Sequence, residues 1–128
     1  GYSFQYDNAR RLLLAMTSEA TGDLMLVHTD HVLATGDWSH VVVTWDSDEV
    51  HIYVNGTDVV TAVLDYFLDY GGNQTTVAEN YPFRSSNGDV VVGTQIPGNS
   101  WRFDGVISDV RIYDRFMSEA EVLEHSGM

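Results

Sequence analysis

The sequence predicts an all-β domain, built as an antiparallel β-sandwich with one short helix near the C-terminus. Two observations support this fold class. Short segments with apolar residues at alternating positions recur along the 128 residues, and connections rich in Asp, Asn and Gly separate them, as in antiparallel strands joined by turns. A helical pattern follows only after Arg115.

Three short strands are expected in the N-terminal third. They are residues 2–6, 11–16 and 24–28, which are rich in aliphatic and aromatic side chains. Asp7-Asn8 and Thr21-Gly22-Asp23 divide them. These residue types favour turns, so the segments are expected to run antiparallel.

Two paired strands are expected at residues 38–46 and 50–56. Each carries aliphatic or aromatic residues at every second position, and the second ends in Asn-Gly, a pair typical of tight hairpin turns. Trp38 and Trp45 are expected to pack in the core, because large aromatic side chains are mostly buried.

The segment 103–113 is expected to form a central strand of the sandwich. Bulky side chains occupy both alternating sets of positions from Val106 to Tyr113, as a strand buried on both faces requires. Gly105 suits a bulge or a corner at its start. Residues 90–93 are expected to form another core strand.

A short helix is expected after that strand. Ser118 suits the N-cap position, and Glu121 stands three residues later, where it can complete a capping box. Ala120, Val122 and Leu123 would give the helix an apolar side.

The segments at 38–46, 50–56, 90–93 and 103–122 together resemble laminin G-like domains of the concanavalin A-like lectin/glucanase superfamily. The resemblance covers about residues 38 to 122 and implies a jelly-roll sandwich; the N-terminal third fits the family pattern less well. Family members usually have earlier strands, so residues 1–128 are expected to be one domain that lacks its first strands. We expect it to be the C-terminal part of a longer chain, with a processed product or a sandwich completed by another chain as alternatives.

Composition indicates an acidic domain. The chain has 19 acidic residues, a formal net charge of −13, no Cys and no Lys, and all six basic residues are Arg. This pattern predicts either a halophilic protein or an acidic surface that keeps an extracellular protein in solution. Nucleic acid is not expected as a partner, because such a surface repels phosphate. No apolar run approaches the roughly 20 residues of a membrane span, so membrane insertion is not expected.

An enzymatic role is not expected. Glucan-cleaving relatives on this fold carry a Glu-x-Asp-x-x-Glu or Glu-x-Asp-x-Glu strand, and that spacing is absent here. Asp46, Asp48 and Glu49 are close in sequence but lie in an expected turn, which favours a solvated acidic loop over a catalytic pair. The sequence has no Gly-x-Ser-x-Gly motif and no Cys nucleophile.

One structural calcium ion is the metal that the resemblance implies. Asp109 matches an acidic residue of the family that is sometimes a calcium ligand, whereas Ser108 replaces a second one; pairing of Asp109 with an Arg is the alternative. His28 and His31 would flank an expected turn and have no third ligand nearby, so a surface role is favoured for them. His40 is expected to pack, and His51 to face away from the apolar side of its strand.

The expected carbohydrate site lies on the long connection between residues 64 and 89. Loops beyond about 15 residues are usually functional or disordered, and this one combines aromatic rings, which stack on sugar C–H groups, with amides. The candidate residues are Tyr66, Tyr70, Asn73, Asn80, Tyr81 and Arg84 in that loop, together with Trp101. The alternative is that the loop folds back on the sandwich. Asn55 and Asn73 also start glycosylation acceptor patterns, and the expected turn is enough to explain Asn55.

These observations predict a non-catalytic, lectin-like binding module for carbohydrate recognition or surface attachment. We expect it outside the cell or at a cell surface, with a glycan or surface polysaccharide as partner. The alternative is a structural sandwich that contacts other subunits of a surface assembly or of a virus particle.

Overall fold

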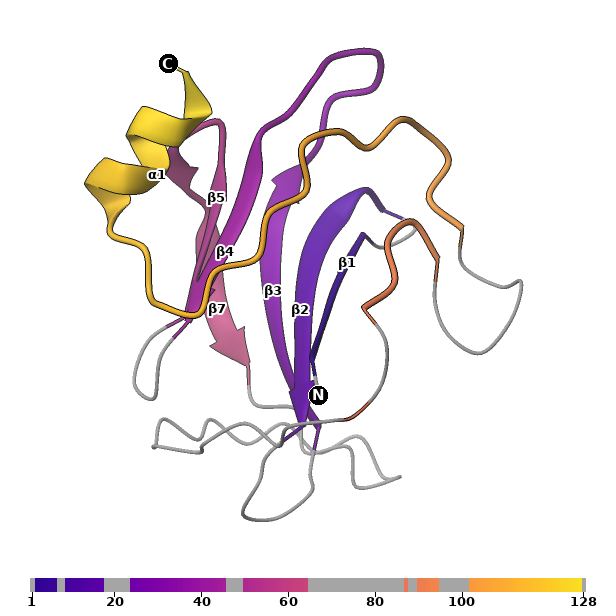
Figure 1. Cartoon of the computed structure of the whole chain (residues 1–128). Coiled ribbons are helices and arrows are strands. Elements are labelled where there is room, and N and C mark those ends of the chain that lie inside the picture. The colour runs from indigo at the N-terminus through magenta and orange to yellow at the C-terminus, as the bar shows by residue number, and fades with distance from the viewer. Residues whose placement is uncertain are drawn as a thin grey trace.

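The computed structural model describes residues 2–6, 9–17, 24–45, 50–64, 87, 90–94 and 102–127. Seven strands and one helix lie in this part of the chain (Figure 1). They are β1 (Tyr2–Tyr6), β2 (Arg11–Thr17), β3 (Leu24–Val32), β4 (Val41–Trp45), β5 (Val50–Val54), β6 (Thr57–Asp58), β7 (Val60–Leu64) and α1 (Glu119–Ser126). The expected all-β sandwich with a short C-terminal helix is confirmed.

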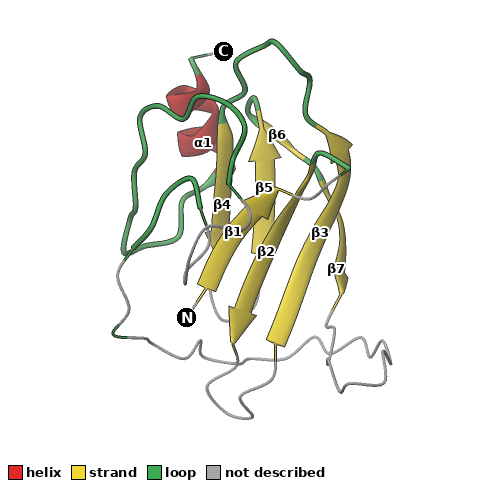
Figure 2. Ribbon diagram, turned by 90° about the vertical axis from the view of Figure 1, so that its right-hand side faces the viewer, coloured by secondary structure: helices red, strands yellow, loops and turns green. Residues whose placement is uncertain are grey.

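The first sheet has the strand order β1-β2-β3-β7, and all of its pairs are antiparallel. Figure 2 shows its strands side by side. Tyr2 lies opposite Met16 and Leu14 opposite Val27. The register shifts between His28 and Thr29, where β3 meets β7. This irregularity is typical of a β-bulge.

The second sheet has the order β4-β5-β6 and is also antiparallel. The turn between β5 and β6 is Asn55-Gly56, with φ of 52° and 82°. Both residues have positive φ, which is the backbone shape of a type I′ hairpin turn and explains why Asn-Gly is found there. The expected pairing of β4 with β5 and the expected turn at Asn55-Gly56 are confirmed. After β6 the chain crosses to the first sheet as β7.

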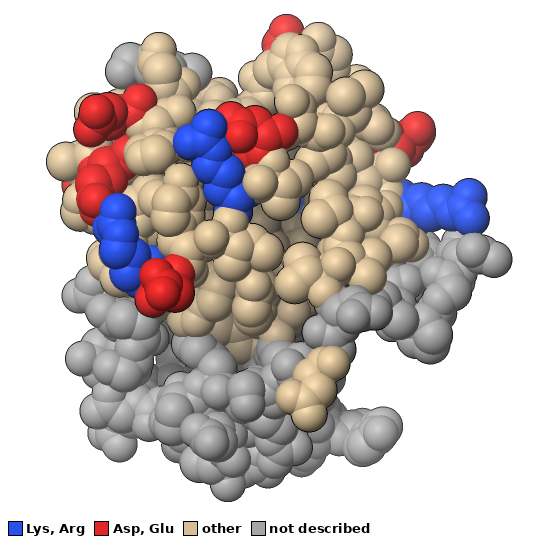
Figure 3. Space-filling model, in the orientation of Figure 1, with Lys and Arg blue, Asp and Glu red and all other residues tan. Residues whose placement is uncertain are grey.

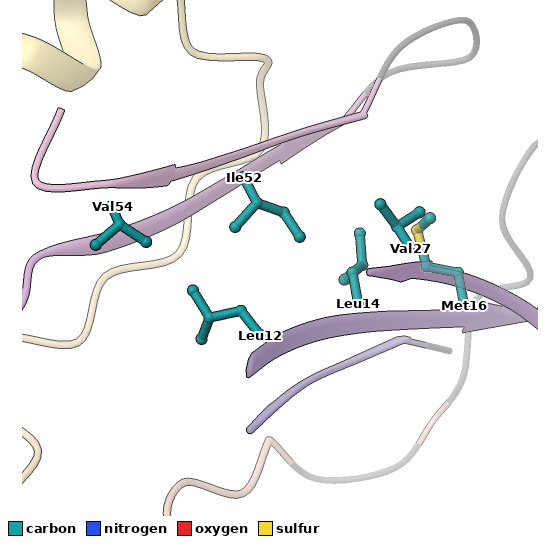
Figure 4. Packing of buried hydrophobic residues seen from close by; sticks show 6 residues of the cluster. All are labelled: Leu12, Leu14, Met16, Val27, Ile52 and Val54. Atoms are coloured by element: carbon teal, nitrogen blue, oxygen red, sulfur yellow. The ribbon is translucent and has the colours of Figure 1, made fainter. Parts of the chain in front are cut away.

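The core lies between the two sheets. Leu12, Leu14, Met16 and Val27 from the first sheet meet Ile52 and Val54 from the second, and all six are buried (Figure 4). Trp45 packs at the edge of this cluster, with its ring centroid 4.9 Å from that of Tyr2. Its expected place in the core is therefore confirmed.

The helix α1 covers the outer face of the second sheet. Tyr53 points away from the main core and forms a second buried cluster with Met117 and Val122. Figure 1 shows α1 outside β4 and β5, on the side away from β1 to β3. The expected capping box is present, because Ser118 and Glu121 bond to each other's backbone N–H. Gly127 ends the helix with a φ of 71°.

The segment 103–113 does not form the expected central strand. Its side chains are exposed, and within the described ranges no strand pairs with it. Asp109 has a φ of 54°, which breaks the extended alternation halfway along the segment. Arg111 stabilises this shape locally, since its Nε and Nη2 donate to the two carboxylate oxygens of Asp109 at 2.8 and 3.0 Å. Alternation alone was thus an insufficient signal for a strand.

Other elements also differ from expectation. Residues 90–93 contain no strand. Strand β3 continues to Val32, so His28 and His31 lie within one strand and do not flank a turn. Strands β6 and β7 were not expected as separate elements. No helix in the described part is long and apolar enough to cross a membrane.

Candidate functional site

A surface hollow of 330 Å³ lies between two segments that are far apart in the sequence. One is the connection from β3 to β4, and the other is residues 103–106, at the start of the segment that leads to α1. Figure 1 shows the two near each other at the top of the molecule. The lining residues are Ala34, Gly36, Asp37, Trp38, Phe103, Gly105 and Val106. Aromatic, apolar and carboxylate groups therefore meet in one place.

Trp38 is the most exposed aromatic residue of the hollow. It is 69% exposed, whereas Phe103 is 39% exposed. The expectation that Trp38 packs in the core is therefore wrong. The physical reason is its position: β4 begins only at Val41, so Trp38 lies in the preceding loop, outside the alternation that turns side chains toward the core.

Phe103 is held in place by its neighbours. Its N–H donates to the Gly93 carbonyl at 2.9 Å, and its ring meets the ring of Tyr6 edge-on at 5.7 Å. The ring also lies over Gly105, where an added Cβ would come within 2.7 Å of Phe103 Cε1. Glycine at 105 thus allows the ring to occupy this position.

The loop that carries Trp38 is anchored at both ends. At its start, Leu33 N–H donates to the Arg10 carbonyl at 3.0 Å, and Arg10 Nη1 donates to Thr35 Oγ1 at 2.5 Å. At its end, His40 N–H donates to Asn55 Oδ1 at 2.9 Å. These bonds favour one position of the loop before any ligand arrives, which lowers the entropy cost of binding.

The lining residues can supply two kinds of contact. An exposed indole face stacks on apolar C–H groups. The Asp37 carboxylate accepts hydrogen bonds from hydroxyl groups. Asp37 is the charged residue among those that the structure describes in the lining. The hollow therefore suits a ligand with an apolar face and hydroxyl groups at its edge.

The carbohydrate site expected from the sequence lies outside the described residues. This applies to Tyr66, Tyr70, Asn73, Asn80, Tyr81, Arg84 and Trp101. Their role stays a prediction. The hollow itself was missed, although Gly36-Asp37 directly before Trp38 indicates a turn and could have placed that tryptophan on a loop.

Asp109 pairs with Arg111, which was the alternative to a calcium site, and its role as a calcium ligand stays a prediction. Calcium takes six to eight oxygen ligands, whereas both carboxylate oxygens of Asp109 accept hydrogen bonds from Arg111. These bonds raise the pKa of Arg111, with Tyr113 as a second cause. The described residues contain no group of three His, Cys, Asp or Glu side chains arranged to hold a metal. A calcium ion, at Asp109 or elsewhere in the chain, stays a prediction.

His40 and His51 both make contacts within the fold. His40 is half-buried and bonds to Asn55 through its backbone. His51 lies on the same face of β5 as Tyr53, away from the face that carries Ile52, as expected. Its Nδ1 is 2.7 Å from Asp58 Oδ2. Its ring also meets Phe116 edge-on at 6.1 Å.

Comparison with known proteins places the chain in a family. No curated protein matches it. Among solved structures, it is similar to an S-layer domain-containing protein (residues 221–444) from Clostridium thermocellum, with 22% identity and a TM-score of 0.43. The alignment covers 98% of this chain and 63% of the other. A laminin G family model, described as the concanavalin A-like lectin/glucanases superfamily, matches residues 1–123, including the N-terminal third. The chain therefore belongs to the laminin G-like family of the concanavalin A-like lectin/glucanase superfamily.

Proposed function

We propose that this domain is a non-catalytic binding module that acts at a cell surface or outside the cell and recognises carbohydrate. The exposed indole of Trp38, beside Phe103 and the Asp37 carboxylate, supports this proposal most directly. A ring that stacks on a ligand contributes about 0.5–1.5 kcal/mol beyond the area it buries. A single site of this kind binds weakly, which suits a module that works in repeated copies on a surface.

The composition of the hollow supports a role without catalysis. Glycoside cleavage uses two carboxyl groups on opposite sides of the scissile bond, about 5 to 9.5 Å apart. Among the described residues of the lining, Asp37 supplies a carboxylate, and no second carboxylate is present to complete the pair that hydrolysis requires.

A glycan-binding screen of the purified domain, followed by titration calorimetry, tests the proposal. Trp38→Ala is expected to remove binding without unfolding, because the side chain is largely exposed. Tyr113→Ala removes another exposed aromatic residue outside the hollow and is expected to bind as wild type does. Equal binding by wild type and Trp38→Ala would contradict the assignment of the site.

The same screen separates the hollow from the loop predicted from the sequence. A combined Tyr70→Ala, Tyr81→Ala, Trp101→Ala variant removes aromatic rings of that prediction. Loss of glycan binding in this variant alone would assign the sugar to Trp101 and the connection between residues 64 and 89. Loss in both would indicate one extended site.

A role in surface assembly is the second candidate. Segment 103–113 pairs with no strand in the described part of the chain. Its exposed aliphatic side chains, with exposed fractions from 44% to 72%, are Val106, Ile107, Val110 and Ile112. Figure 3 shows uncharged surface interrupted by charged side chains where Figure 1 places this segment, which carries the exposed ion pair of Asp109 and Arg111. Exposed apolar patches are typical of interaction surfaces. The proposed occupant is a neighbouring copy of this chain in a surface or virion assembly.

Sedimentation of the domain in molar salt tests this second candidate. Association is expected to increase with protein concentration and to weaken in an Ile107→Ser, Ile112→Ser variant. Both side chains are exposed, so the variant should fold. A wild-type domain that stays monomeric at high concentration would contradict assembly through this segment.

A further inference from the structure

We infer that two copies of this chain join through segment 103–113 across a two-fold axis at Val110, and that salt strengthens the contact. This inference rests on the second candidate under the proposed function, surface assembly, and specifies its partner and its regulation. Three features support it: the exposed aliphatic side chains of the segment, the order of its charges, and the net charge of the domain.

The exposed aliphatic side chains form one patch from two parts of the chain. Phe103 N–H donates to the Gly93 carbonyl at 2.9 Å, and a Cβ at Gly93 would lie 3.9 Å from Ile107 Cδ1. The chain just before Gly93 therefore lies beside segment 103–113. The members of this apolar patch, with exposed fractions from 44% to 72%, are Val92, Val106, Ile107, Val110 and Ile112.

The charges of the segment suit a second copy of the same segment. Asp109 and Arg111 lie on either side of Val110 and form an ion pair at 2.8 Å within one chain. Their side chains remain 68% and 54% exposed, so a neighbouring molecule can reach both. In a two-fold contact, each residue on one side of the axis meets its counterpart from the other side. An axis at Val110 therefore brings Asp109 of each copy beside Arg111 of the other, and opposite charges meet twice.

The apolar patch is matched by the same operation. Aliphatic side chains lie before Val110, at Val106 and Ile107, and after it, at Ile112. Each half of the patch can therefore cover the other half of a second copy. A two-fold contact uses the patch of both copies, so association is expected to stop at the dimer.

The net charge of the domain opposes this contact in dilute buffer. Each copy carries a formal charge of −13, so two copies repel each other before the patches meet. The Debye length falls from about 10 Å at 0.1 M salt to about 3 Å at 1 M, which screens this repulsion, whereas ion pairs that the contact partly buries are screened less. Burial of aliphatic side chains does not depend on charge. Salt should therefore favour the dimer.

Sedimentation equilibrium of the domain in sodium chloride tests the salt dependence. We expect monomers and dimers, with a dimer dissociation constant about tenfold lower at 1 M than at 0.1 M, because the repulsion between the two net charges is screened. A dissociation constant that rises with salt would overturn the proposed regulation. Species that grow beyond the dimer would overturn the two-fold contact.

A single cysteine tests the position of the axis. The chain has no Cys, so a disulfide in Val110→Cys can form only between two copies. A residue on the axis lies next to its own copy, within the short distance that a disulfide requires. In molar salt with a mild oxidant, Val110→Cys is expected to cross-link much faster than Thr57→Cys, which places a thiol at an exposed position on β6. Equal rates would show that the axis does not pass at Val110.

Two charge variants test the exchange of ion pairs. Arg111→Glu and Asp109→Arg each bring like charges together in the dimer, so each variant alone should associate more weakly than wild type. An equimolar mixture of the two brings opposite charges together again and should recover association. Asp109 has a φ of 54°, and Arg10 adopts a similar φ of 63° in this chain, so arginine is compatible with the backbone there. If two folded variants show no recovery in the mixture, the exchange is wrong.

The outcomes separate this inference from the assembly candidate. If wild type stays monomeric at every salt and protein concentration, the assembly candidate fails and this inference fails with it. If Ile107→Ser, Ile112→Ser weakens association but Val110→Cys cross-links no faster than its control, assembly through the segment stands and the two-fold arrangement is overturned.

Discussion

Asn55 forms two hydrogen bonds with the backbone of His40. Its N–H donates to the His40 carbonyl at 2.8 Å, and its Oδ1 accepts from the His40 N–H at 2.9 Å. The β5–β6 turn is thereby joined to the residue that precedes β4. Trp38 lies only two residues before His40, so this pair also fixes the end of the loop that forms the candidate site.

Replacing Asn55 tests this link. In Asn55→Ala the His40 N–H loses its acceptor, at a cost of about 1–3 kcal/mol, and alanine must adopt a positive φ, at a further cost of about 1–2 kcal/mol. Asn55→Gly tolerates the positive φ and should lose only the first part. We expect the free energy of unfolding, measured by denaturant titration, to fall in the order wild type, Asn55→Gly, Asn55→Ala.

Thr57→Ala is the matched control for that series. Thr57 is exposed and follows the same turn, so its truncation should change stability by less than about 0.5 kcal/mol. An Asn55→Ala variant as stable as Thr57→Ala would contradict the structural role of the Asn55 side chain.

Gly56 brings the same turn close to the helix. It has a φ of 82°, and a Cβ at this position would lie 2.8 Å from Leu123 Cδ1 and 3.1 Å from Ser126 Oγ. Gly56→Ala is therefore expected to lower stability by about 1–2 kcal/mol from the backbone conformation, with a further loss from the contact with Leu123.

A double-mutant cycle with Leu123→Ala separates these two costs. Leu123→Ala removes the side chain that the new methyl group would meet, so it should recover the steric part of the loss and leave the backbone part. Additive losses, with no recovery in the double variant, would show that the Leu123 side chain moves aside without cost.

The predictable part of the fold follows from local rules. The turn at Asn55-Gly56 was predicted because this pair is typical of tight turns, and the helix because Ser118 and Glu121 form a capping box. Both signals depend on residues within a few positions of each other. The pairing of β3 with β7 was not predicted, because it joins segments more than thirty residues apart and no local pattern specifies it.

The site was harder to predict than the fold, for a related reason. Trp38 and Phe103 are far apart in the sequence, and only the tertiary structure brings both to the hollow. No local sequence pattern could therefore predict that they line the same site. The alternation from Val106 to Tyr113 indicated a buried strand, but the left-handed backbone of Asp109 and its bonds to Arg111 give a different local structure. A periodic pattern indicates which side chains can lie on the same face of a strand. Whether that face is buried depends on the other elements that pack against it.

The calcium prediction can be examined at Asp109. Because both of its carboxylate oxygens bond to Arg111, we expect calcium to change the melting temperatures of wild type and Asp109→Asn by the same amount. The measurement is a thermal melt of each protein with calcium and with a chelator. A rise that occurs in wild type and is absent from Asp109→Asn would show that calcium displaces Arg111 and binds there.

The capping box of α1 predicts how stability responds to acid. Hydrogen bonds from Arg115, and then from the backbone and side chain of Ser118, lower the pKa of Glu121 from 4.5 to about 2. Arg115 Nη2 lies 2.8 Å from Glu121 Oε1, and Ser118 N–H donates to Glu121 Oε2 at 2.8 Å. Since the pKa is lower in the folded state, this contribution to stability is complete above pH 4.5 and is lost as the pH falls from about 4.5 to 2.

Glu121→Gln should therefore flatten the stability profile in that range. The variant is expected to be less stable than wild type at pH 7, and the difference should shrink between pH 4.5 and 2, measured by thermal melts in molar salt. Glu119→Gln changes a neighbouring acidic residue in the first turn of α1 without touching these bonds. It should remove less of the pH dependence than Glu121→Gln. Parallel profiles for wild type and Glu121→Gln across this range would show that Glu121 does not link the stability of the domain to pH.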